Sequence, residues 1–167
     1  QMAFEIIKQL EPTTMKELIE LTEIPAPPFM EQKRAERFMQ MLKNAGIDSI
    51  WTDEVGNVLA LRKGKGNGKT VLIEGHLDTV FPLDTDVKVK MKGDTLFAPG
   101  IADDTRALSV VLTVVKAMNQ AKISTESDIL FAGTVGEEGL GDLRGIKHIF
   151  KSGNQKIDSH IALDGGD

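Results

Sequence analysis

The segment TVLIEGHLDTV, residues 70–80, is the stretch of sequence from which the fold can be argued. It begins with an uninterrupted apolar run, residues 71–73, which is typical of a strand that is buried on both faces. Directly after this run come His76 and Asp78, whose side chains can bind metal ions or orient such ligands. A buried strand that ends in polar side chains is typical of α/β proteins, in which ligands bind beyond the carboxyl ends of the strands.

Two further apolar runs end in the same manner. The run at residues 129–135 leads to Glu137 and Glu138, and the run at residues 161–163 leads to Asp164. Parallel strands bring their carboxyl ends to one edge of a sheet, so these side chains are expected to converge although they are far apart in the sequence. The sequence therefore predicts a polar site at that edge.

Helical and strand patterns alternate along the chain. The helices are predicted from a capping box at Thr14 and Glu17 to a point before Pro25, and at residues 31–45, 104–118 and 143–151. The strands are predicted at residues 49–52, 57–62, 70–75, 129–135 and 161–163, with a hairpin at residues 86–97. This order predicts an α/β domain whose sheet is mostly parallel and carries helices on both faces.

Composition and charge limit the classes of function. The 167 residues are 41% hydrophobic, which fits a single globular domain. There are 25 acidic and 20 basic residues, and the resulting net charge of -5 argues against a nucleic-acid partner. No cysteine is present, so a metal ion must be held by His, Asp and Glu. No run approaches the roughly 20 apolar residues of a membrane span, and a cytoplasmic location without a membrane partner is expected.

The predicted site combines one imidazole with six carboxylates. The imidazole is that of His76, and the carboxylates are those of Asp78, Asp103, Asp104, Glu137, Glu138 and Asp164. Asp103 is expected at the start of the predicted helix, where the helix dipole favours a negative charge. Repulsion among these groups would raise several pKa values unless divalent cations compensate it, and two such cations would make a site for hydrolysis. Ligands of this kind without sulfur favour zinc, with manganese or cobalt as alternatives. Asp78 is expected to orient the imidazole.

Ordinary interpretations compete with this one. An acidic residue after a strand is often a turn former or a helix cap, and a single histidine is most often structural, but the joint pattern favours a metal site. Two glycine-rich segments, residues 63–70 and 139–145, partly match nucleotide-binding loops, although neither has the required glycine spacing. We interpret the first as a hairpin turn and the second as a segment whose backbone approaches the metal site.

Four motifs resemble those of a known family. They are GHLDTV (75–80), APGIADDTRA (98–107), GTVGEEGLGDLRG (133–145) and ALDGGD (162–167). In content and order they are similar to motifs of the co-catalytic di-zinc exopeptidases, which include aminoacylase, carboxypeptidase G, succinyl-diaminopimelate desuccinylase and peptidase T. The DDTR and DGG elements most resemble peptidase T. The resemblance implies a three-layer α/β/α catalytic domain with a mostly parallel mixed sheet.

The resemblance also implies roles for individual residues. Asp103 would bridge two zinc ions, His76 and Asp164 would complete the first zinc site, and Glu138 would bind the second zinc. Glu137 would be the general base, which takes a proton from water and returns it to the leaving nitrogen.

A cis peptide bond between Asp103 and Asp104 is implied as well. In the family the second zinc takes a further histidine from later in the chain, after a lid or dimerisation domain, whereas here three residues follow Asp164. We therefore interpret residues 1–167 as the amino-terminal part of the catalytic domain, truncated before the lid. This part is expected to hold one zinc and to be inactive alone. The chain begins at Gln1, so a removed leader stays an open alternative.

The other two histidines are not expected to replace the missing ligand. His160 lies four residues before Asp164, which corresponds to about 13 Å along an extended strand and places it at the opposite end of the sheet. His148 is expected on the surface of a helix.

The sequence leaves three classes of function open. The leading hypothesis is a zinc-dependent exopeptidase or amidohydrolase that acts on small peptides or acylated amino acids and dimerises through the lid domain. The alternative is a non-catalytic metal-binding or interaction module. A third hypothesis, based on the glycine-rich segment at residues 63–70, is a nucleotide-binding domain.

Overall fold

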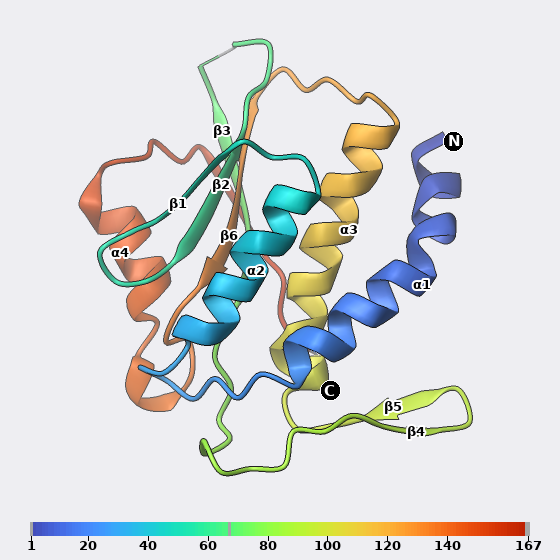
Figure 1. The fold of residues 1–167 in the computed structure, drawn as a ribbon. Helices are drawn as coiled ribbons and strands as arrows, with labels where there is room; N and C mark the ends of the chain where they lie inside the picture. The colour runs from blue at the N-terminus through green and yellow to red at the C-terminus, as the bar shows by residue number, and fades with distance from the viewer. Residues whose placement is uncertain (1, 67, 166–167) are drawn as a thin grey trace.

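The computed structural model describes residues 2–66 and 68–165, and its main feature is a five-stranded sheet (Figure 1). The strand order is β1-β2-β6-β3-β7, with β1 at Ser49–Thr52, β2 at Val58–Arg62, β3 at Thr70–His76, β6 at Asp128–Thr134 and β7 at Ser159–Ala162. β6, β3 and β7 are parallel, and β2 is antiparallel to both of its neighbours. Of these five strands β2 alone is therefore reversed, and the predicted mostly parallel mixed sheet is confirmed.

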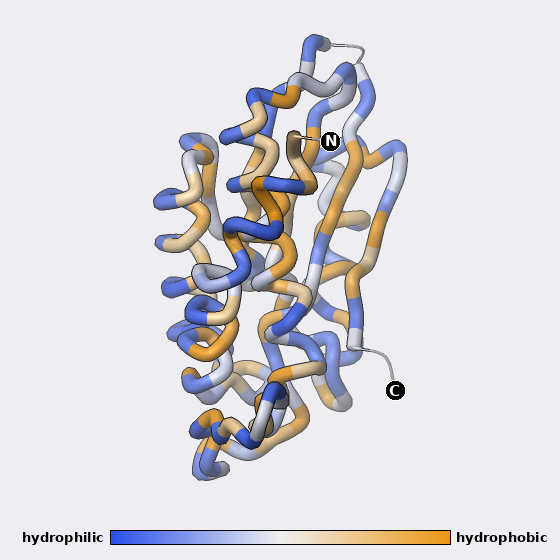
Figure 2. Tube along the Cα trace, turned by 90° about the vertical axis from the view of Figure 1, so that its right-hand side faces the viewer, coloured by the Kyte–Doolittle hydropathy of each residue, from blue (hydrophilic) through white to orange (hydrophobic). Residues whose placement is uncertain are grey.

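Helices cover both faces of this sheet. α1 (Met2–Thr22), α2 (Gln32–Asn44) and α3 (Arg106–Gln120) lie on one face, and α4 (Arg144–Ser152) lies on the other (Figure 1). Neighbouring strand residues point to opposite faces, so Phe131 packs into the core under α2 and α3 while Leu130 packs with Ile149 of α4. Figure 2 shows the central strands as largely apolar and the outer edges of the helices as hydrophilic. The three-layer α/β/α architecture is confirmed.

Most predicted elements lie within two residues of their observed bounds, but the start of α1 differs. Thr14 lies inside α1, where its Oγ1 is 2.6 Å from Oγ1 of Thr113 in α3. The capping-box prediction is therefore wrong, because threonine and glutamate three residues apart also occur within helices. Pro12, which is unfavourable in a helix interior, lies within α1 as well. Among the described residues, no helix combines the length and the apolar character needed to cross a membrane.

The segment at residues 63–69 is not a hairpin turn. It joins β2 to β3, and β6 lies between these two strands in the sheet. A strand follows the segment where a phosphate-binding loop would continue into a helix, so the structure gives no support to a nucleotide site there. The predicted hairpin is present, with β4 (Lys90–Lys92) paired to β5 (Thr95–Phe97) and projecting from the body of the domain (Figure 1).

Candidate metal centre

The carboxyl ends of three parallel strands meet at one edge of the sheet. His76 is the last residue of β3, Glu137 and Glu138 follow β6, and Asp164 follows β7. The register pairs His76 with Thr134 at the end of β6, so these strand ends lie level with each other. The predicted convergence is thus present in the structure. The last two residues of the ALDGGD motif lie outside the described part of the chain.

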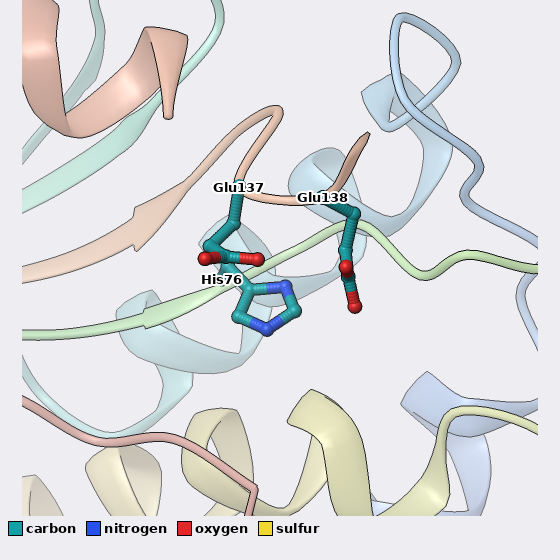
Figure 3. A group of neighbouring side chains, drawn as sticks. All are labelled: His76, Glu137 and Glu138. Carbon is teal, nitrogen blue, oxygen red and sulfur yellow. The ribbon is translucent and has the colours of Figure 1, made fainter. Parts of the chain in front are cut away.

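Two groups of potential ligand atoms share His76. One group is His76 with Asp103 and Asp164, the other is His76 with Glu137 and Glu138, and within each group the ligand atoms lie within 4.8 Å of one another. His76 Nε2 is 2.9 Å from Asp103 Oδ1 and 3.8 Å from Asp164 Oδ1. Figure 3 shows that both glutamates extend from one loop toward the imidazole ring. Zinc bonds of about 2 Å bring ligand atoms to comparable separations, so both groups fit a divalent ion.

Asp103 reaches this cluster from a turn and not from a helix. Its backbone angles are φ -120° and ψ 98°, and the regular helix α3 begins only at Arg106. The predicted start of the helix at Asp104 is therefore two residues too early, and Asp103 lies in the irregular turn that precedes α3. The peptide bond between these two residues is cis, as the family resemblance implies.

Asp104 contacts the site but belongs to neither ligand group. Its side chain is buried, and Oδ2 accepts the backbone N–H of His76 at 2.9 Å. Burial raises the pKa of this carboxyl group to about 7. Asp104 therefore supports the end of β3 through this hydrogen bond. Of the six expected carboxylates, the two ligand groups contain four, and Asp78 and Asp104 belong to neither.

Asp78 links the end of β3 to the loop after β6. Its Oδ1 and Oδ2 accept the backbone N–H groups of Glu137 and Glu138, each at 2.9 Å. His76 Nδ1 lies 2.9 Å from the main-chain carbonyl of Asp78 and 3.7 Å from its carboxylate. Burial raises the pKa of Asp78, but the contact with His76 and the two N–H groups outweigh it and lower the pKa. The main chain of Asp78 thus holds the imidazole, and its carboxylate positions both glutamates.

Arg34 supports the turn between His76 and Asp78 and was missed in the sequence. It lies in α2, is fully buried, and donates to the carbonyl oxygen of Leu77 at 2.9 Å and to that of Ile24 at 2.6 Å. Burial lowers its pKa to about 10, which leaves the guanidinium charged at neutral pH. The sequence signal that could have revealed Arg34 is its position on the apolar face of the helix predicted at residues 31–45.

A second missed residue, Arg144, anchors the loop that carries both glutamates. Its guanidinium makes three contacts of 3.0 Å with the buried carboxylate of Glu31 and lies 4.5 Å from the ring centroid of Phe29. Its backbone N–H donates to the carbonyl of Gly136 at 3.1 Å. Gly136 has φ +61°, and a Cβ there would lie 2.0 Å from Arg144 Nη1, so only glycine fits this turn.

The glycine-rich segment at residues 139–145 packs closely against the turn at Gly136. A Cβ on Gly141 would lie 2.5 Å from Cα of Gly136. The backbone of this segment also reaches both glutamates of the site, because the N–H of Gly141 donates to the carbonyl of Glu138 at 2.8 Å and the N–H of Leu143 donates to the carbonyl of Glu137 at 3.4 Å. The expected approach of this backbone to the site is therefore present in the structure. The segment acts on the site by holding that turn.

The carboxylates shift the pKa values within the cluster. Burial lowers the pKa of His76, but Asp78, Asp104 and further carboxylates outweigh this effect and raise the pKa to about 10. Burial raises the pKa values of Glu137 and Glu138, and neighbouring acidic groups add to both shifts. Without a metal ion, the imidazole therefore carries a proton at neutral pH, and a divalent cation would take the place of that proton.

Zinc binding is expected to release at least one proton at neutral pH. Because zinc requires neutral His76, whose pKa is raised to about 10, the affinity should rise by roughly tenfold per pH unit between pH 6 and 8. Calorimetric titration in two buffers with different enthalpies of ionisation measures both quantities. An affinity that does not change with pH, without proton release, would contradict this assignment.

The two remaining histidines differ in their relation to the site. His148 lies on α4 with Nε2 2.8 Å from Glu54 Oε2, outside both ligand groups. His160 also lies outside both groups, but it lines one pocket together with His76 and Asp164. The register pairs His160 with Leu72, four residues before His76, so its backbone lies away from the strand ends as expected. Its side chain nevertheless reaches the pocket, where Nε2 lies 3.2 Å from Glu74 Oε1.

An α/β/α domain with one histidine and several carboxylates at its strand ends can hold divalent metal ions of the kind that hydrolases use. Residues 72–166 match the family described as Peptidase family M20/M25/M40. The chain belongs to this family, and the predicted membership of a metallopeptidase family of hydrolases is confirmed.

Curated relatives and solved structures agree with this membership. The chain is 33% identical over 126 residues to a putative [LysW]-lysine/[LysW]-ornithine hydrolase of Pyrococcus abyssi, covering 75% of this chain and 34% of the relative. It is 23% identical over 145 residues to a succinyl-diaminopimelate desuccinylase of Corynebacterium glutamicum, covering 87% of this chain and 39% of the relative. The chain thus spans about a third of the length of the first of these relatives.

Solved structures share the fold. The di-peptidase Dug1p of Saccharomyces cerevisiae superimposes with a TM-score of 0.79 at 20% identity, covering 97% of this chain and 40% of that one. The aminopeptidase PepT of Bacillus cereus gives a TM-score of 0.77 at 22% identity, covering 92% and 43%. Both likenesses concern the arrangement of helices and strands.

Proposed function

We propose that the chain is the metal-binding part of a zinc-dependent hydrolase that cleaves peptide or amide bonds in small peptides or acylated amino acids. The observation that carries the proposal is the pair of ligand groups that share His76 at the strand ends. Membership of a peptidase family and relatives named as hydrolases, a desuccinylase and a carboxypeptidase support it. We assign the first zinc to His76, Asp103 and Asp164, and the second to Asp103 and Glu138.

Glu137 is assigned as the general base. A divalent ion bound at these groups would act as a Lewis acid and lower the pKa of water. Burial raises the pKa of Glu137, which suits a carboxylate that takes up a proton and passes it to the leaving nitrogen. The hydrogen bond of 2.9 Å from its backbone N–H to Asp78 fixes the start of the side chain.

The longer protein is proposed to complete the site. A histidine outside these residues would complete the second zinc site, and dimerisation would use a lid domain that this chain does not include. Alone, the chain would hold one zinc and be inactive. A cytoplasmic location stays a prediction.

Removal of metal tests the function. Treatment of the longer protein with a zinc chelator should abolish hydrolysis of a panel of dipeptides, tripeptides and acylated amino acids, and added zinc should restore it. Magnesium serves as the control and should not restore activity, because it prefers oxygen ligands and octahedral geometry. Full activity in protein shown to be metal-free would overturn the proposal.

A further inference from the structure

A pocket of about 230 Å³ opens beside the metal centre on the α4 side of the sheet. His76, Glu137 and Asp164 line it where it meets the metal centre, and Leu143 and Ile146 form part of its apolar wall. At about 30 Å³ per water molecule, this volume equals roughly seven or eight waters and suits one amino-acid side chain.

The polar end of this pocket is formed by Glu74, Thr134 and His160. Glu74 lies two residues before His76 on the same face of β3, which places it about 6 to 7 Å further from the strand end. Its side chain is 10% exposed, Oε2 accepts the hydroxyl of Thr134 at 2.7 Å, and Oε1 lies 3.2 Å from His160 Nε2. An ionised carboxylate has about four acceptor positions, so these two contacts leave room for a further donor.

The charge of Glu74 is not used by the metal centre. Among the described residues, the two ligand groups draw on His76, Asp103, Asp164 and the glutamates after β6, and neither includes Glu74. Metal ions would compensate the negative charges of the carboxylates at the rim of the pocket. They would not compensate the charge of Glu74 at its polar end. A low-exposure carboxylate beside apolar walls favours a cation with hydrogen-bond donors and repels an anion.

We propose that this pocket binds the side chain of a substrate residue next to the scissile bond and selects a cationic group on an aliphatic stem. Leu143 and Ile146 contact the stem, and Glu74, held by Thr134 and His160, pairs with the ammonium or guanidinium group. The inference rests on the proposed hydrolase function and adds the substrate class.

Dipeptides that carry lysine, norleucine or glutamate at each position in turn test this inference in the longer protein. At one position, kcat/KM for lysine should exceed that for norleucine by at least tenfold, with glutamate the poorest, because a charge-assisted hydrogen bond has about this effect. Glu74→Gln keeps the shape of the side chain and should lower the ratio of lysine to norleucine by about tenfold or more. Thr134→Val should lower this ratio by less, since it loosens the carboxylate without removing it.

Glu54→Gln is the matched control, because Glu54 pairs with His148 in the same manner outside this pocket. It should leave the ratio unchanged. The inference would be overturned if Glu74→Gln left the ratio of lysine to norleucine unchanged, or if it lowered kcat/KM equally for all three side chains. Glu74 would then have only a structural role.

A binding measurement separates this inference from the proposed function. If the longer protein cleaves none of these dipeptides, the hydrolase proposal fails, whereas the pocket is still tested by titrating lysine amide and norleucine amide into the zinc-loaded chain. Lysine amide should bind at least tenfold more tightly, and Glu74→Gln should remove this difference. Equal binding of both amides would overturn the inference by itself.

Discussion

Glu137→Gln is expected to lower kcat of the longer protein by about a thousandfold while leaving zinc bound. Glutamine retains the shape of glutamate but cannot take a proton from water, and positioned acid–base catalysis contributes about 10²- to 10⁴-fold. Glu137 also belongs to a potential ligand group with His76 and Glu138, so zinc content distinguishes a base from a ligand. Turnover by rapid kinetics and zinc by mass spectrometry measure both properties.

The matched control for this variant is Glu126→Gln. Glu126 is an exposed glutamate that pairs with Lys65 away from the strand ends, and its replacement should leave turnover and zinc content unchanged. Normal turnover of every substrate by Glu137→Gln would show that the base assignment is wrong. Loss of zinc together with activity would instead make Glu137 a ligand.

Asp78→Asn is expected to weaken zinc binding by about 10- to 100-fold, because groups that orient metal ligands have effects of this size. Asp78 is fully buried, and its two oxygens accept the N–H groups of Glu137 and Glu138. Asparagine offers one oxygen and turns an NH₂ group toward the other N–H. The unsatisfied donor should also lower the free energy of unfolding by about 2 kcal/mol.

Zinc calorimetry and denaturant titration measure the two effects of Asp78→Asn. Asp142→Asn is the control, since the Asp142 side chain is 83% exposed and lies in the same loop region. An Asp78→Asn protein with the zinc affinity of the unchanged chain would contradict the view that Asp78, whose carboxylate lies 3.7 Å from His76 Nδ1, helps to orient this ligand.

The strand ends of the site were predictable because they depend on local sequence. Each apolar run requires a buried strand, and parallel strands bring the residues after their carboxyl ends to one edge of the sheet. His76, Glu137, Glu138 and Asp164 were found on this basis, and the structure brings all four into the two ligand groups. Their roles as ligands and base stay predictions.

The supporting contacts were not predictable because they join distant parts of the chain. Arg144 and Glu31 are 113 residues apart in the sequence, and Glu74 and His160 are 86 residues apart. Neither pair has a local pattern, and each forms only when the layers have packed. The bend at Asp103 was missed for a related reason, because the helical pattern after it does not show where regular helix begins.

The central claim is that the strand-end cluster binds a metal ion, and a calorimetric zinc titration of this chain tests it most directly. One tight site per chain is expected, lost in Asp103→Ala and retained in Asp94→Ala, which removes an exposed aspartate in the turn between β4 and β5. Absence of zinc binding, or equal binding by the Asp103→Ala protein, would contradict the claim.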